Sequence, residues 1–149
     1  MNKEQLLNRL QQDWKVFLES LEGLPASALS EPDVVGHWSV RDVMGHITTW
    51  EEEKMKIIPL ILKGKPIHRR YSSVDAFNAQ EQKRKQHLPL EQVKQELAAT
   101  HERLAAFLAD LPEDAYTSGS RLLRSLRLTC NHYREHGAQI TAWRQKRKL

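Results

Sequence analysis

Apolar residues recur at three- and four-residue steps along most of the chain, and this spacing constrains the fold more than any other feature. Residues spaced in this way share one face of an α-helix, whereas a half-buried strand alternates at every second residue. The first such stripe comprises Leu6, Leu7, Leu10, Trp14, Phe17, Leu18 and Leu21. No segment shows a convincing two-residue alternation, so the pattern predicts an all-α protein.

Capping and breaking residues give the bounds of the first two helices. A helix is expected over about residues 3–22, ended by Gly23 and Pro25. The next helix begins after Ser39, which is a good N-cap and forms a capping-box pattern with Asp42. Its apolar positions continue to Leu62.

The second half of the chain predicts one short and two long helices. Residues 65–72 are expected to form a loop, followed by a short polar helix over about 74–86. A third long helix runs from Pro89 to about residue 111, and a fourth from Ser120 into the basic C-terminal residues. Four long amphipathic helices with one longer connection predict a four-helix bundle with a crossover and a short extra helix. No linker or composition break divides residues 1–149, so a single domain is expected.

Cysteine content and hydropathy indicate the cellular compartment of the protein. Cys130 is its only cysteine, which excludes an intramolecular disulfide and suits a reducing cytoplasm. The longest apolar run, residues 57–62, is far shorter than the ~20 residues that span a bilayer. We therefore expect a cytoplasmic protein without a membrane partner.

The net charge of +4 is mildly basic, and much of the excess lies in the C-terminal cluster of Arg144, Lys146, Arg147 and Lys148. Cations at the end of a helix interact favourably with the helix dipole. No aromatic platform or DNA-reading motif accompanies the cluster. On these grounds no nucleic acid partner is expected.

His132 and His136 are spaced to share a metal ion. Residues four apart lie on the same face of a helix, with Cβ atoms roughly 5–6 Å apart. Two imidazole nitrogens at that spacing can bind one divalent ion. The alternative is that one histidine completes a buried hydrogen-bond network while the other faces solvent.

The string from His132 to His136 also matches the H-x-x-E-H pattern of inverted zinc peptidases. Those enzymes need a further acidic ligand well downstream, and the 13 residues after His136 include none. Glu135 lies about 100° around the helix from His136 and is expected to face solvent. The peptidase interpretation is therefore rejected.

His46 is the third candidate ligand. It lies between Val43 and Ile47 on the apolar side of its helix, where an unpaired polar group is costly, so it must find a hydrogen-bond partner or bind a ligand. Taken alone, a hydrogen-bonded core histidine is the better interpretation, whereas the pair on another helix favours a three-histidine site. Three imidazoles with one open position are typical of a catalytic metal site, and such ligands suit zinc or nickel. Gly45 and Gly137 are expected to let the helices approach closely enough for the rings to converge.

Trp50, Tyr133 and Gln139 are candidates for the pocket or for contacts with the ligating histidines, although core or solvated positions would explain them equally well. Glu53 lies two turns after His46 and could reach the rim, but a solvated carboxylate is the simpler interpretation. His101 is expected on a largely polar side of its helix. No residue is identified as a catalytic acid or base.

Two segments of the chain resemble a known family. Residues 38–47, WSVRDVMGHI, followed by Trp50-Glu51, resemble the second-helix signature of the DinB-like superfamily, and residues 132–140, HYREHGAQI, resemble its closing H-x3-H signature. The middle of the chain, residues 75–78 and 88–111, is similar to the DfsB-like branch of that superfamily.

The resemblance implies a four-helix bundle, often dimeric, with a divalent metal held by the histidines that match His46, His132 and His136. Members include thiol-dependent transferases, isomerases and hydrolases, and the DfsB-like branch is associated with self-protection against reactive small molecules. The leading hypothesis is a metal-dependent hydrolase or thiol transferase acting on an unknown small reactive molecule. The alternatives are a non-enzymatic binding or self-protection protein and a structural dimerisation module.

Overall fold

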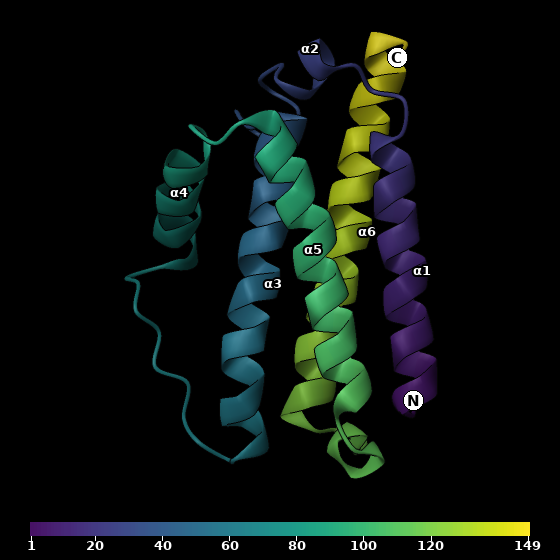
Figure 1. Cartoon of the computed structure of the whole chain (residues 1–149), viewed down its shortest axis with the longest axis vertical. Helices are drawn as coiled ribbons and strands as arrows, with labels where there is room; N and C mark the ends of the chain where they lie inside the picture. The colour runs from purple at the N-terminus through teal and green to yellow at the C-terminus, as the bar shows by residue number, and fades with distance from the viewer.

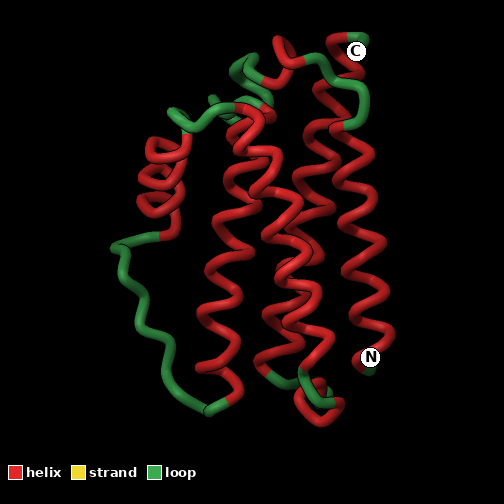
Figure 2. Tube along the Cα trace, in the orientation of Figure 1, coloured by secondary structure: helices red, strands yellow, loops and turns green.

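Four long helices run side by side for most of the length of the molecule (Figure 1). The computed structural model describes all of residues 1–149 and contains α1 (Lys3–Leu21), α2 (Ala26–Leu29), α3 (Val40–Leu62), α4 (Val74–Lys85), α5 (Leu90–Asp110), a 3₁₀ turn η1 (Glu113–Tyr116) and α6 (Arg121–Arg147). No strand is present, and loops join the helices at the two ends (Figure 2). The predicted all-α bundle with a crossover and a short extra helix is confirmed.

The helix starts follow the capping chemistry of the sequence. The Ser39 hydroxyl accepts from the Asp42 backbone N–H, and the Asp42 carboxylate accepts from the Ser39 N–H, so the predicted capping box is formed. Asn2 and Gln5 form a second capping box at the start of α1. Pro89 is the N-cap of α5 and does not lie in its first turn. The single turn of α2 was not predicted, because a four-residue helix is too short to show apolar periodicity in the sequence.

The chain direction explains the crossover. In Figure 1, α3 and α5 both run downward, so the chain must return along the side of the bundle between them. Residues 63–73 and α4 make that return. α1 and α6 both run upward and pack against each other, and α3 packs mainly against α5.

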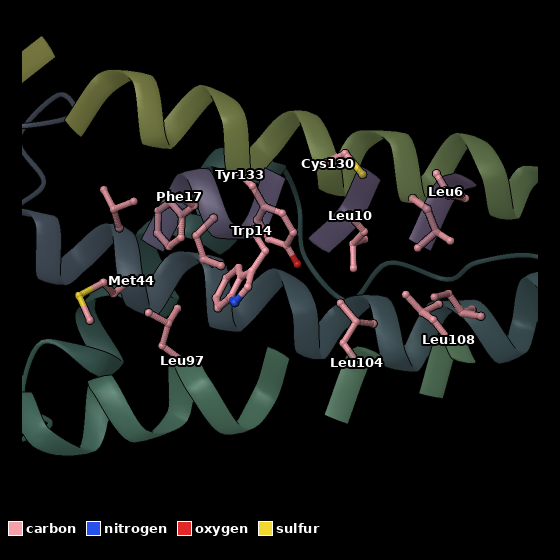
Figure 3. Packing of buried hydrophobic residues seen from close by; sticks show 14 of the residues in the cluster. Leu6, Leu10, Trp14, Phe17, Met44, Leu97, Leu104, Leu108, Cys130 and Tyr133 are labelled. Atoms are coloured by element: carbon pink, nitrogen blue, oxygen red, sulfur yellow. The ribbon is translucent and has the colours of Figure 1, made fainter. Parts of the chain in front are cut away.

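One cluster of buried apolar side chains joins the four long helices. Figure 3 shows α1, α3, α5 and α6 each contributing to it, with Trp14 and Tyr133 side by side near its centre. The rings of these two residues lie 5.1 Å apart, edge to face. α4 buries only Lys85, so it is an outlying layer against α3 rather than a member of the core.

No helix combines the length and the apolar character that crossing a membrane would need.

Candidate functional site

His46 of α3 and His132 and His136 of α6 lie together in the structure. One ring nitrogen from each residue lies within 4.8 Å of the other two. The Nε2 atoms of His46 and His132 are 2.8 Å apart, which is hydrogen-bond distance. Residues from two helices, separated by 86 positions in the sequence, thus direct their nitrogens to one point.

The orientation of His136 is set by Gln139, one turn further along α6. Nδ1 of His136 lies 2.7 Å from the Gln139 side-chain oxygen, so this nitrogen carries the proton and donates it. Nε2 of His136 therefore keeps its lone pair. The His136 ring lies 5.1 Å from that of His46 and 4.6 Å from that of His132.

All three imidazoles are held in the neutral form. Burial, with smaller repulsion from His132 and His136, lowers the pKa of His46 to about 2. Burial, with repulsion from His136 and Lys54, lowers the pKa of His132 to about 3, and burial also lowers the pKa of His136. Neutral imidazole is the form that binds metal ions.

The donor set fits one divalent ion. Ligands about 2.0–2.1 Å from a tetrahedral ion lie roughly 3.3 Å from each other, so His46 and His132 would separate by about half an ångström. The nitrogens that now lie up to 4.8 Å apart would move closer together. The three rings are neutral, and no carboxylate belongs to the cluster. Three protein nitrogens leave one tetrahedral position open to a ligand.

Trp38, in the loop before α3, covers one side of His46, with ring centres 4.8 Å apart. This contact was not predicted, because no local pattern shows that the loop before α3 reaches a residue two turns into the helix.

A cleft of about 480 Å³ opens beside His46 and His132 between α3, α4 and α6. Of the three candidate pocket residues, Trp50 and Tyr133 line this cleft, whereas Gln139 lies outside it and contacts His136. The remaining lining residues are Ile47, Glu51, Lys54, Val74, Asn78, Leu128, Thr129, Asn131 and Glu135. The cleft is therefore partly apolar, with a few polar groups.

Aromatic contacts hold the crossover against the cleft. Trp50 meets Phe77 of α4 edge to face at 5.4 Å, and Phe77 stacks on Tyr71 at 4.6 Å. The Trp50 indole N–H donates to the Asn78 side chain over 2.8 Å. Trp50 thus both lines the cleft and anchors α4.

Below the histidines, Glu51, His101 and Tyr133 form a buried polar network that the sequence did not reveal. The Glu51 carboxylate accepts from the Tyr133 hydroxyl at 2.7 Å and from Nδ1 of His101 at 2.8 Å. Glu51 is 2% exposed and His101 is 5% exposed. The His101 ring stacks on Trp14 with ring centres 3.8 Å apart.

The prediction that His101 lies on a polar side of its helix is therefore wrong. Thr100 and Glu102 beside it look polar in sequence, but His101 points between α1, α3 and α6, where Glu51 supplies a partner. Burial and the Glu51 carboxylate together raise the pKa of Tyr133 well above its usual value, so its hydroxyl stays a donor.

The remaining candidates have simple roles. Glu53 pairs with Lys56 over 3.1 Å, away from the three histidines, and Glu135 is exposed as expected although it borders the cleft. Cys130 is fully buried, and burial raises the pKa of its thiol to about 11. It is therefore a core residue.

The two glycines do not bring the histidine rings together, contrary to expectation. Gly137 faces the Phe17 backbone of α1, and Gly45 faces the Lys85 side chain of α4. Each glycine is one residue from a histidine and therefore points about 100° away from it around the helix.

The architecture thus defines the class of protein: a four-helix bundle with a crossover and three histidines beside a cleft. The model of the DinB superfamily matches residues 9–140, and the chain belongs to that superfamily. The predicted resemblance is thus confirmed. No curated protein matches the sequence significantly.

Solved structures share the fold at low sequence identity. An uncharacterised protein from Escherichia coli UTI89 matches with a TM-score of 0.83 and 18% identity, over 99% of this chain and 95% of that one. The sibling lethal factor precursor DfsB matches with a TM-score of 0.80 and 14% identity, over 100% and 98%. The DfsB fold, to which the middle of the chain was compared, therefore extends over the whole of it.

A third structure corrects one expectation. The colibactin self-resistance protein ClbS, in complex with a double-stranded DNA, matches with a TM-score of 0.79 and 16% identity, over 95% of this chain and 94% of that one. The exclusion of a nucleic acid partner is wrong, because it relied on the lack of a DNA-reading motif, and a protein of this fold is seen with DNA.

Proposed function

We propose that this protein binds a divalent ion through His46, His132 and His136 and acts on a small reactive molecule in the adjoining cleft. The observation that supports this most is the convergence of three neutral imidazole nitrogens within 4.8 Å. A zinc or nickel ion held there would supply Lewis acidity to a ligand atom at its open position.

The residues around the cluster have distinct roles in this proposal. Gln139 holds the His136 ring by accepting from Nδ1, which leaves Nε2 for the ion. Trp38 covers His46 and limits its contact with water. Trp50 and Leu128 offer apolar surface to a bound molecule, and Glu51 lines the cleft with a carboxylate already held by Tyr133 and His101.

Metal analysis of untagged protein tests the proposal. We expect about one equivalent of zinc or nickel by mass spectrometry, and its loss in His132→Ala with helical content retained. The matched control is His68→Ala, since His68 is an exposed loop residue. Protein that stays metal-free after incubation with zinc, nickel, cobalt and manganese salts would overturn the proposal.

The non-enzymatic alternative predicts a different result. The solved structures include a self-resistance protein, ClbS, which is compatible with binding or sequestration of a reactive compound by this fold. A ligand that raises the melting temperature equally with and without a chelator, and is recovered unchanged, would favour sequestration over catalysis.

DNA binding is a second candidate function, supported by a row of exposed arginines. Arg121, Arg124 and Arg127 recur every three residues along the first half of α6. The exposed cations Lys63, Lys65, Arg69 and Arg70 lie in the crossover, and the Arg121 guanidinium donates to the Lys65 carbonyl oxygen at 3.4 Å, which places the two segments together. Cations gathered in this way can contact phosphates.

The C-terminal basic cluster is less available for this purpose. The Arg144 guanidinium donates to the carbonyls of Ser20 and Glu22, and Arg147 pairs with Glu31. Two of the four cations are thus engaged in contacts within the protein, whereas Lys146 and Lys148 stay exposed without an ion pair.

Fluorescence anisotropy with a duplex at several salt concentrations tests DNA binding. Each lost phosphate contact reduces the slope of log K against log salt by about 1. We expect Arg124→Gln/Arg127→Gln to reduce it by about 2 and Arg103→Gln, an exposed arginine on α5, to leave it unchanged. No measurable binding at low salt would exclude this function.

A further inference from the structure

Lys54 is a half-buried cation without an anionic partner. It lies on α3 two turns after His46 and lines the cleft. Its Nζ donates to the Ser125 hydroxyl of α6 over 2.7 Å, and it forms no ion pair. Shielding a charge from water without a counter-charge costs free energy, so a lysine in this position suggests a functional role.

The other lysines near α3 show what is unusual about Lys54. Lys85 is more deeply buried, but it donates to the Gly45 carbonyl oxygen at 3.2 Å, pairs with Glu52 at 3.6 Å and does not line the cleft. Lys56 is exposed and paired with Glu53. Lys54 alone among these three combines partial burial, an amine without an ion pair and a place in the lining of the cleft.

Burial alone lowers the pKa of Lys54 to about 8. Roughly a tenth of its amines are then neutral at pH 7, against far below one per cent for an ordinary lysine. Its titratable neighbours in the cleft are Glu51 from α3 and His132, Tyr133 and Glu135 from α6, with His46 two turns away. A lysine whose amine is partly shielded from water in a cleft is a usual form of activated amine nucleophile.

We propose that Lys54 is a nucleophile of the cleft and bonds covalently to a conjugated carbonyl compound that carries an apolar group. Trp50, Val74 and Leu128 provide the apolar surface for that group. The Nζ lone pair forms a bond to the β-carbon, the carbon–carbon π pair moves toward the carbonyl, and the nitrogen proton passes to the α-carbon. Nothing leaves and no further reactant is needed.

This step goes beyond the proposed metal site because it needs no metal ion. It also has no competition from a thiol, since Cys130 is the only cysteine and is fully buried with a raised pKa. The histidines of the cleft are the remaining groups that could react with the same compound.

The experiment uses phenyl vinyl ketone, a conjugated ketone with one aromatic ring, on chelator-treated protein. Peptide mass spectrometry gives the modification rate at each lysine and histidine between pH 6 and 9. At pH 7 we expect Lys54 to react at least about tenfold faster than Lys56 and Lys85. Its rate should level off above about pH 8, while that of Lys56 continues to rise.

Lys54→Arg keeps the positive charge and a donor for Ser125 but removes the nucleophile. We expect it to lose the fast adduct while keeping its melting temperature and its metal content. Lys54 modified no faster than Lys56, or label confined to the histidines, would overturn the proposal. The wild-type rates decide this even if the variant is unstable, and the metal content of untreated protein separately decides the proposed function.

Discussion

Glu51, His101 and Tyr133 place hydrogen-bonding groups inside a core that is otherwise apolar. Pairing lowers the cost of burying a polar group, and each of the three residues has a partner, although Oε1 of Glu51 and Nε2 of His101 have none. Glu51 belongs to an acidic run, residues 51–53, that looks solvated in sequence. Its burial depends on partners 50 and 82 positions away, and no local pattern shows such contacts.

Removing the Tyr133 hydroxyl tests the strength of this network. Tyr133→Phe should lower the free energy of unfolding by about 2 kcal/mol, because hydrogen bonds to carboxylates are stronger than those between neutral groups. Tyr116→Phe is the matched control, since its buried hydroxyl donates to the Leu108 carbonyl oxygen. Urea denaturation should show a loss of only about 1 kcal/mol there. An equal or larger loss in Tyr116→Phe would contradict the prediction.

The low pKa values of His46 and His132 predict acid sensitivity of the metal-free protein. In the unfolded chain both residues take up protons near pH 6.5, but in the folded protein they do so only at about pH 2 and 3. The unfolded state therefore binds more protons, and stability falls as the pH drops below about 6.5. Each such group contributes a slope of up to about 1.4 kcal/mol per pH unit.

Urea denaturation of chelator-treated protein between pH 7 and 5 measures this slope. His46→Gln should flatten it, whereas His68→Gln should not, because His68 is exposed in a loop. Identical pH dependence in wild type and His46→Gln would show that the histidine cluster is not the cause.

The helices were predictable because each one carries its own signals. Apolar stripes, the capping box at Ser39 and the breakers near Pro25 and Gly64 all act within a few residues, so the bounds of α1, α3 and α4 agree with expectation to within a residue or two. Which helices pack against each other was harder to predict. The close contact between α1 and α6 at Gly137 depends on which helices become neighbours, which the local sequence does not specify.

That contact predicts opposite effects of small and large replacements. A Cβ at Gly137 would lie 3.4 Å from the Phe17 Cα, an ordinary contact, and alanine favours helix by about 1 kcal/mol over glycine. Gly137→Ala should therefore keep or slightly raise the free energy of unfolding. Gly137→Leu should lose roughly 1–3 kcal/mol, because the larger side chain forces α1 away.

Ala138→Leu is the control for the leucine variant, because Ala138 lies next to Gly137 on α6 but is exposed. Thermal and urea denaturation of the three variants separate packing from helix propensity. An unchanged free energy of unfolding in Gly137→Leu would show that the interface between α1 and α6 can accommodate a larger side chain.

At the scale of the whole molecule, one core joins all four long helices, and no helix pair has a separate one. We therefore propose that residues 1–149 unfold as a single domain, in one transition. Far-ultraviolet circular dichroism and tryptophan fluorescence should give coincident melting curves, and the calorimetric and van't Hoff enthalpies should agree. Trp14 reports on the core and Trp50 on the crossover contact. A fluorescence change that precedes the loss of helical signal, and that a Trp50→Phe variant no longer shows, would indicate that α4 melts first.

The fold and the three converging histidines could thus be predicted from helical periodicity and an i, i+4 spacing. The cleft itself could not, since it exists only where the crossover lays α4 against α3 beside α6. Lys54 illustrates the difference, because its sequence neighbours resemble a solvated surface while its partner Ser125 lies 71 residues away.

Because Cys130 is buried, a fluorescent label can be attached to this protein at one chosen position. Since its only native thiol is buried and protonated at neutral pH, the wild-type chain should not react with maleimide dyes. A cysteine introduced at Leu128, which is 63% exposed beside the cleft, would then be the single reactive thiol. One fluorophore at that position can monitor occupancy of the cleft without removing any native side chain from the core.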